Sequence, residues 1–331
     1  MAGADLFKST NAKAAANMFG REAEAHAVAD RLPDLLVEGV RISNTVAHGV
    51  HGRRRAGPGE TFWQFRQFQS GDPAQMIDWR RSASSDHLFI REREWEAAHT
   101  IWLWPDISPS MAFKSHLSAT SKGDRTLVLM FAAAEMLVRG GERVAMMGLT
   151  QPSASRKATS RIAEMLAANL RQTGLTQSAP PQQRVSRFSS TIWISDFLDP
   201  VASISRRIDE LASSGSTGHL VQVLDPAEET LPYTGRTEFI GMEDDTRWVA
   251  DRAESLRETY QRRLVAHRAE LQEVCRRNGW SFMLHHTDRP AAEPMLKLIM
   301  RLRGEALTSH APKSAVSDDE PATAAARKSA P

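Results

Sequence analysis

The fold of this chain is decided by the stretch Ile101-Trp102-Leu103-Trp104-Pro105-Asp106-Ile107-Ser108-Pro109-Ser110-Met111. It opens with four large apolar residues in a row, which is typical of a strand buried on both faces of a parallel sheet. An acid and two hydroxyls follow at alternate positions, at Asp106, Ser108 and Ser110. Hard divalent cations prefer oxygen ligands in octahedral geometry and keep some of their waters. The stretch therefore predicts a buried strand with a candidate metal-binding loop at its end.

Four further short apolar runs predict buried strands of the same kind, over residues 143–149, 191–195, 219–224 and 281–285. Helical patterns lie between most of these strands, over residues 124–139, 158–171, 201–213, 251–278 and 294–304. The alternation predicts an α/β fold: a doubly wound, mostly parallel sheet with helices on both faces. Ligands of such sheets bind beyond the carboxyl ends of the strands, where the strand order reverses.

A second acid follows another of these strands, because the run 191–195 leads directly into Asp196. If the two strands are neighbours at the switch point, Asp106 and Asp196 face each other. A Mg²⁺ ion, or Mn²⁺, could then take the hydroxyls of Ser108 and Ser110 directly and be held by the two carboxylates through water. One position would stay open for an incoming acidic group. Each part alone has a simpler interpretation, since an Asp at a strand end is often a turn former.

Composition and charge indicate a globular protein of one large domain or two ordinary ones. The chain has 331 residues, of which 41% are hydrophobic and 25% charged, and its net charge of +2 does not predict a nucleic-acid partner. Its single cysteine, Cys275, excludes a disulfide framework and fits a reducing compartment. The N-terminus lacks the apolar core of a signal peptide, and the longest apolar stretch, 126–138, is too short to span a bilayer. We therefore expect a soluble, cytoplasmic protein without membrane insertion.

Patterning along the chain predicts four parts. Residues 1–20 have little apolar patterning and are expected to be mobile, and residues 21–97 hold a helix followed by a block rich in aromatic residues and arginine. Residues 98–305 form the α/β domain, in which the Pro- and Gly-rich segment 226–245 could form a hairpin. Residues 306–331 gain Ala, Ser, Pro and Lys and lose apolar periodicity, which predicts a disordered tail.

Two of these segments resemble known families. The loop from Asp106 to Met111 resembles the metal-ion-dependent adhesion site of von Willebrand factor type A domains. The block before it resembles the bacterial DUF58 family, in which such a block precedes a von Willebrand A-like domain. The matching residues are Phe65-Arg66-Gln67-Phe68-Gln69-Ser70-Gly71-Asp72-Pro73, Ile77-Asp78-Trp79-Arg80-Arg81-Ser82-Ala83 and Ile90-Arg91-Glu92. The resemblance covers about residues 45–305.

The resemblance implies a binding module rather than an enzyme. Such proteins are similar to those encoded beside MoxR-type AAA+ ATPases, and they are thought to act with that ATPase in chaperone-like maturation or assembly of client proteins. An Asp or Glu of the partner would complete the coordination of the metal ion. Two features depart from the family pattern. The Thr ligand of fuller adhesion sites has only Thr150, Thr159 or Ser155 as candidates, and none lies in a convincing motif. In addition, many relatives carry transmembrane helices before the conserved block, so this chain resembles a soluble version.

Two rival functions remain open at this point. A metal-dependent hydrolase, acting for example on phosphoesters, would suit two acids at a switch point, but the sequence offers no convincing general base or nucleophile–base pair. The lack of a convincing Thr ligand would be consistent with a structural scaffold whose metal site has been lost. A metal ion that binds only the folded protein must stabilise it, so unchanged thermal stability with Mg²⁺ and with chelator would favour the scaffold.

Overall fold

The computed structural model describes the backbone of residues 2–51, 64–69, 74–85, 87–92, 99–174, 178–243 and 246–309. Helix α1 (Ala2–His51) begins well before the helix that the periodicity predicts, and the mobility of residues 1–20 stays a prediction. The predicted tail lies outside the described residues from residue 310 onward.

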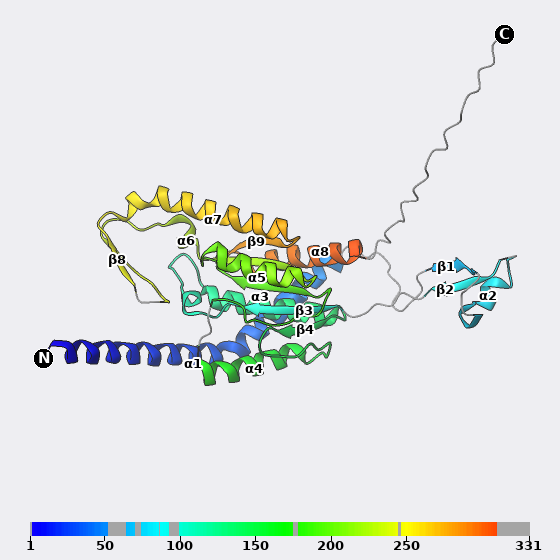
Figure 1. Ribbon diagram of the computed structural model, residues 1–331, viewed down its shortest axis with the longest axis horizontal. Coiled ribbons are helices and arrows are strands. Elements are labelled where there is room, and N and C mark those ends of the chain that lie inside the picture. The colour runs from blue at the N-terminus through cyan, green and yellow to red at the C-terminus, as the bar shows by residue number, and fades with distance from the viewer. Residues whose placement is uncertain are drawn as a thin grey trace, which may run out of the picture.

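A five-stranded parallel sheet forms the centre of the α/β domain (Figure 1). Its strands are β3 (Thr100–Pro105), β4 (Arg143–Met146), β5 (Ser190–Ser195), β6 (Thr217–Leu224) and β9 (Ser281–His286). Their order in the sheet is β4-β3-β5-β6-β9, and every neighbouring pair is parallel. The predicted fold class and all five predicted strands are confirmed.

The sheet is covered on both faces because successive strand residues point to opposite sides. Three helices pack on one face: α3 (Lys122–Arg139), α4 (Ala158–Thr173) and α8 (Ala292–Ser309). Two helices pack on the other: α5 (Val201–Ser213) and α7 (Arg257–Arg277). In β3, Ile101 and Leu103 belong to the first core, whereas Trp102 and Trp104 belong to the second. The run of large apolar residues thus packs into both hydrophobic cores, one on each face of the sheet.

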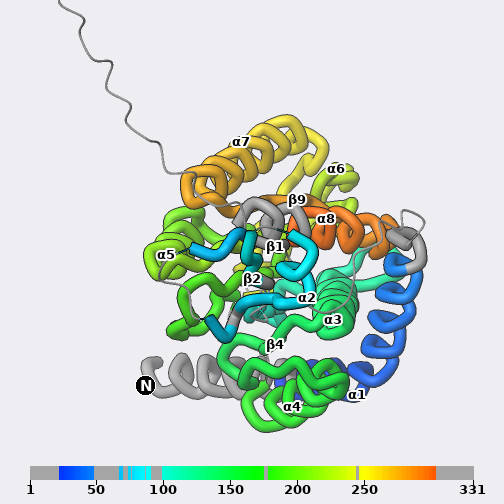
Figure 2. Tube along the Cα trace, turned by 90° about the vertical axis from the view of Figure 1, so that its right-hand side faces the viewer, coloured from blue at the N-terminus to red at the C-terminus, as the bar shows by residue number. Residues whose placement is uncertain are grey.

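Helix α1 adds a further layer outside the first core, where it packs along α3 and α4 (Figure 2). Its buried positions recur every three or four residues, as expected of a helix with one apolar face. They are Ala25, Ala29, Leu32, Leu35, Gly39, Ser43 and Val46. Pro33 lies on the exposed side, where the missing N–H removes one helical hydrogen bond and favours a bend.

The contact of α1 with α3 requires a glycine at residue 39. A Cβ atom at Gly39 would lie 2.8 Å from the Phe131 Cβ and 3.0 Å from the Ala132 nitrogen. We expect Gly39→Val to lower the free energy of unfolding by about 1–3 kcal/mol, because overpacking outweighs the small gain in helix propensity. Urea denaturation would measure the change. Val37→Ala, at a position that is 69% exposed, is the control and should change stability little. Wild-type stability of Gly39→Val would contradict the close contact.

The aromatic block before the α/β domain forms a small unit of its own (Figure 1). Strands β1 (Gln64–Gln67) and β2 (Phe89–Glu92) pair antiparallel, and the short helix α2 (Trp79–Ser82) lies between them in the chain. Asp78 caps α2 by accepting a hydrogen bond from the Arg81 nitrogen at 3.0 Å.

The Pro- and Gly-rich segment 226–245 contains the first strand of a hairpin, and the second strand lies just beyond it. Helix α6 (Pro226–Thr230) follows β6, and strands β7 (Thr237–Ile240) and β8 (Arg247–Ala250) then pair antiparallel. The chain continues into α7. The hairpin therefore lies at the carboxyl ends of the strands, the edge at which ligands of such sheets bind.

Candidate functional site at the switch point

The strand order reverses between β3 and β5. These are the two strands that lead into Asp106 and Asp196, so they are neighbours at the switch point, as predicted. The chain moves from β3 outward to β4 on one side, and from β5 outward to β6 and β9 on the other. Pro105 pairs with Ile194, and the Asp106 nitrogen donates to the Ile194 carbonyl at 2.8 Å. Asp106 and Asp196 therefore follow two neighbouring strands at the same edge of the sheet.

Asp106 is a fully buried carboxyl whose two oxygens accept hydrogen bonds from neutral groups. Its Oδ1 accepts from the Ser108 nitrogen at 2.9 Å, and its Oδ2 accepts from the Ser195 hydroxyl at 2.6 Å. Burial, and then the charge of Asp196, raise the pKa of Asp106 to about 7. The negative charge of Asp106 is therefore poorly compensated at neutral pH.

Ser108 and Ser110 lie together beside this carboxyl. Ser108 precedes the short 3₁₀ helix η2 (Pro109–Ala112), and Pro109 sets the first turn with its fixed φ. The two hydroxyl oxygens are 3.1 Å apart, close enough to share one ligand. The Asp-x-Ser-x-Ser spacing thus brings both hydroxyls to one place, as predicted.

Asp196 is held at the end of β5 by a strained turn. Its Oδ1 accepts from the Leu198 nitrogen at 3.2 Å, and its carbonyl accepts from the Gln222 side chain at 2.8 Å. The next residue, Phe197, has a φ of 50°, in the left-handed region that bulky side chains rarely adopt. Such strain costs on the order of 1–3 kcal/mol and is often found at functional sites.

The site also contains a buried lysine that the sequence patterns did not predict. The Lys122 Nζ lies 2.8 Å from the Asp196 Oδ2 and 2.6 Å from the Glu228 Oε1, and its side chain is only 1% exposed. Burial lowers the pKa of Lys122, but the charges of Asp196 and Glu228 outweigh burial, so the pKa is raised overall. Lys122 is therefore a permanent cation at neutral pH.

Glu228 comes from α6 and completes the group. Its Oε2 accepts from the Asp225 nitrogen at 2.9 Å, while Asp225 accepts from the Ala227 nitrogen, so that the two acids form a capping box. Burial raises the pKa of Glu228. We call the whole group the switch-point cluster: Asp106, Ser108, Ser110, Lys122, Asp196 and Glu228.

Two sequence signals could have revealed these missed residues. The periodicity predicts a helix over residues 124–139, with Asp124 as its N-cap, but this start is wrong: Ser121 caps α3 and accepts from the Asp124 nitrogen at 3.0 Å. The true boundary places Lys122 in the first turn, where a cation is disfavoured by the helix dipole and needs acidic partners. The second signal is the pair Asp225 and Glu228. An acid directly after a strand, with a Glu three residues later, is the pattern of a capping box.

The candidate Thr ligands have other partners. The Thr150 hydroxyl accepts from the Met146 nitrogen at 2.8 Å, and the Thr159 hydroxyl donates to Glu135 at 3.2 Å. Ser155 accepts from the Lys157 nitrogen at 3.3 Å, just before α4. These contacts join the three hydroxyls to β4, to α3 and to the start of α4, and none of them involves a residue of the switch-point cluster.

The chemistry of the cluster fits a hard cation. With all carboxyls ionised, Asp106, Asp196 and Glu228 outweigh the Lys122 ammonium by two negative charges, which one divalent cation would neutralise. The part of the chain that the structure describes holds no group of three His, Cys, Asp or Glu side chains arranged for a metal. An ion here would therefore need the adjacent serine hydroxyls as ligands, and hydroxyl oxygens suit Mg²⁺.

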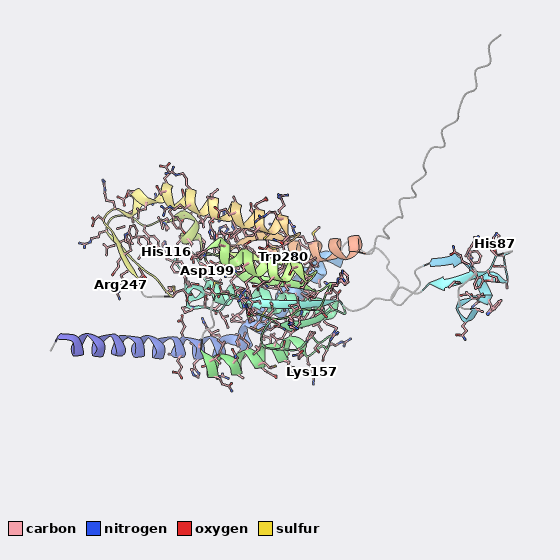
Figure 3. All side chains as sticks on the ribbon, viewed as in Figure 1. His87, His116, Lys157, Asp199, Arg247 and Trp280 are labelled. Carbon is pink, nitrogen blue, oxygen red and sulfur yellow. The ribbon has the colours of Figure 1, made fainter. Side chains whose placement is uncertain are left out.

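A pocket of about 340 Å³ opens over the cluster. Its wall includes Ser110, Lys122 and Asp196 from the sheet edge, and Ile240, Met242 and Glu243 from the β7–β8 hairpin. Figure 3 shows Asp199, another residue of the wall, at the same end of the domain as Arg247 of the hairpin. The hairpin thus forms one side of this pocket.

Comparison with known proteins shows the family of this chain. Residues 64–270 match the family described as "Protein of unknown function DUF58". Uncharacterized proteins of Mycobacterium tuberculosis and Mycobacterium bovis are 24% identical over 285 residues, covering 80% of this chain and 86% of each relative.

Solved structures show lower similarity. An aerotolerance-related membrane protein from Bacteroides fragilis is 16% identical with a TM-score of 0.39, and covers 62% of this chain and 100% of its own. The conserved hypothetical protein BatB from Bacteroides thetaiotaomicron is 15% identical with a TM-score of 0.37, and covers the same shares. An uncharacterized membrane spanning protein from Vibrio fischeri is 15% identical with a TM-score of 0.17, and covers 61% of this chain and 96% of its own.

These comparisons correct the expected location. The prediction of a cytoplasmic protein is wrong, because the similar solved structures include proteins described as membrane proteins. Among the helices that the structure describes, none has the length and apolar character needed to cross a bilayer.

Proposed function

Because the chain belongs to the DUF58 family, we propose that it is a protein-binding adaptor that works with a MoxR-type AAA+ ATPase in the maturation or assembly of client proteins. The observation that supports this proposal is the switch-point cluster, which lies beneath a pocket at the edge where sheets of this kind bind ligands. The family resemblance is the reason for proposing an ATPase as the partner. The cluster supplies the recognition chemistry.

The chemistry of the cluster favours binding over catalysis. Among the described residues that line the pocket, none is a His or Cys. The Lys122 ammonium is held by two carboxylates and cannot act as a base. The oxygens of Asp106 accept from groups of the protein itself, Ser108 and Ser195. No residue of the cluster is therefore arranged as a nucleophile with an adjacent base, which covalent catalysis would need.

We propose that Ser108, Ser110, Asp106 and Asp196 hold a Mg²⁺ ion. When bound, the ion would supply positive charge to which an Asp or Glu of a partner attaches. A carboxylate–cation contact in a partly buried site is stronger than one in water and gives specificity, while the surrounding surface gives affinity.

The test is capture of the purified MoxR-type ATPase of the same organism by the immobilised chain, in millimolar Mg²⁺ and in EDTA. We expect capture in Mg²⁺ and a loss of roughly tenfold or more in EDTA or on Ser110→Ala. Ser213→Ala is the matched control, because this exposed serine at the end of α5 donates to the Glu210 carbonyl of its own helix end. It should capture as wild type does.

A thermal unfolding series separates the alternatives. A cation that binds only the folded chain must raise the melting temperature, and Ser110→Ala should reduce that shift. Equal capture in all conditions, with no shift on adding Mg²⁺, would reject the metal-bridged recognition and favour a scaffold. Turnover of a phosphoester that Asp106→Ala abolishes would favour the hydrolase.

A further inference from the structure

The β7–β8 hairpin places apolar side chains beside the switch-point cluster. On one side of the hairpin, Phe239 stacks on Trp248 with ring centroids 5.7 Å apart. Ile240 and Met242, which line the pocket, are 50% and 38% exposed. Large apolar side chains that remain exposed around a polar pocket are typical of a binding surface.

The tip of the hairpin also contacts the cluster through a carboxylate. The Glu243 Oε1 accepts from the Ser110 nitrogen at 3.1 Å, although the two residues are 133 positions apart in the chain. Ser110 is the half-buried serine of the pair whose hydroxyls lie 3.1 Å apart. A carboxylate of the chain itself therefore stands next to the hydroxyl pair, on the side that faces the pocket.

We infer that Glu243 is an internal ligand of the switch-point cluster, placed where the acidic side chain of a partner binds. This inference rests on the proposed function, since it assigns the partner's carboxylate to the position at Ser110. It also describes the partner: a protein segment with an Asp or Glu flanked by large apolar residues, as Ile240 and Met242 flank Glu243. The partner must displace the hairpin tip before it binds.

The construction of the hairpin suits such displacement. A two-stranded hairpin is only marginally stable by itself. Its tip is closed by the Gly241 nitrogen donating to the Thr246 carbonyl at 2.7 Å, and its base is tied by the Ala253 nitrogen donating to the Gly235 carbonyl at 2.9 Å. The tip can therefore leave Ser110 while the base stays attached to the domain, as a local opening.

Electrostatics explain why the internal contact should depend on a cation. The pocket wall already contains Asp196, Asp199 and Glu228, with Lys122 as its cation. The Glu243 carboxylate adds a further negative charge, so added positive charge at the cluster should strengthen its contact with Ser110.

The first test measures hydrogen exchange of the Ser110 amide in the full chain. Glu243→Ala should speed this exchange about tenfold or more, because the amide loses a charged acceptor. Glu238→Ala is the control: it removes an acid from the same hairpin, one that pairs with Arg247 at 3.3 Å, and should leave Ser110 unchanged. Exchange at Ser110 should slow further when Mg²⁺ replaces EDTA.

The second test uses the hairpin sequence as the probe. A fluorescent peptide copy of residues 237–250, closed by added terminal cysteines, is titrated into the full chain. We expect binding to the Glu243→Ala chain at least tenfold tighter than to wild type. A peptide with Glu243→Gln should bind weakly to both chains.

Equal Ser110 exchange in wild type and Glu243→Ala would overturn the inference. So would a peptide that binds both chains equally, or neither. These measurements use no ATPase, so failure of ATPase capture alone counts against the proposed function and not against the internal ligand. Ser110 exchange that is slowed by Glu243 but insensitive to Mg²⁺ supports the internal ligand and rejects the metal.

Discussion

Lys122→Met is expected to lower the free energy of unfolding by about 3–5 kcal/mol, the usual cost of removing one partner from a buried ion pair. Methionine matches the length of the lysine stem but leaves two carboxylates without their cation. The Lys122 Nζ is 2.8 Å from Asp196 and 2.6 Å from Glu228. The cost arises mainly from these two acids, which would remain buried with uncompensated charge.

Urea denaturation at pH 7 would measure this loss, with Lys114→Met as the control at an exposed lysine. Combining Lys122→Met with Glu228→Gln should recover part of the stability, because the second change removes one of the stranded charges. A Lys122→Met chain within 1 kcal/mol of the control, as a rough threshold, would mean that the ion pair contributes little.

Asp106→Asn is expected to stabilise the chain at pH 8 in EDTA, by on the order of 2–4 kcal/mol. Asn keeps the shape of Asp and can still accept from the Ser108 nitrogen and donate to the Ser195 hydroxyl. The pKa of Asp106 is raised by burial, and then by Asp196, to about 7 from 3.8. Between pH 3.8 and about pH 7, Asp106 therefore holds a proton in the folded chain that it has released in the unfolded chain.

The sign of the pH dependence follows from this difference. The contribution of Asp106 to stability is complete below pH 3.8 and falls as the pH rises to about 7. Asn does not titrate, so the advantage of Asp106→Asn should be small at pH 4 and largest at pH 8. Urea denaturation at several pH values would measure it, with the exposed Asp251→Asn as the control.

Magnesium should reduce the difference in free energy of unfolding between Asp106→Asn and wild type at pH 8. The reason is that a cation stabilises the ionised form of Asp106 and not the amide of Asn. A variant less stable than wild type at pH 8 in EDTA would contradict the view that the Asp106 charge is poorly compensated.

Local patterns were sufficient to predict much of the site. Asp106 and Asp196 each end a buried apolar run, and parallel strands deliver their carboxyl ends to one edge of a sheet. The alternate spacing of Ser108 and Ser110 was also sufficient to place their hydroxyls together. These predictions depended on residues within a few positions of one another, or on a general rule for α/β sheets.

The residues that the sequence analysis missed are those whose partners lie far along the chain. Lys122 is separated from Asp196 by 74 positions and from Glu228 by 106 positions. No local sequence pattern predicts contacts between residues so far apart. The unfavourable place of a lysine in the first turn of α3 could still have suggested that Lys122 has acidic partners. The misplaced helix start at Asp124 hid even that signal.

By itself, the sequence determined the α/β class, the five parallel strands and the two acids and two hydroxyls at the switch point, because hydrophobic periodicity and strand-end residues act locally. Only the tertiary structure decided that the site contains a buried cation, that α1 packs on α3 through Gly39, and that Glu243 reaches Ser110. These contacts depend on the order of strands and on close packing between distant segments, whose free energies are set by burial and charge in the folded chain.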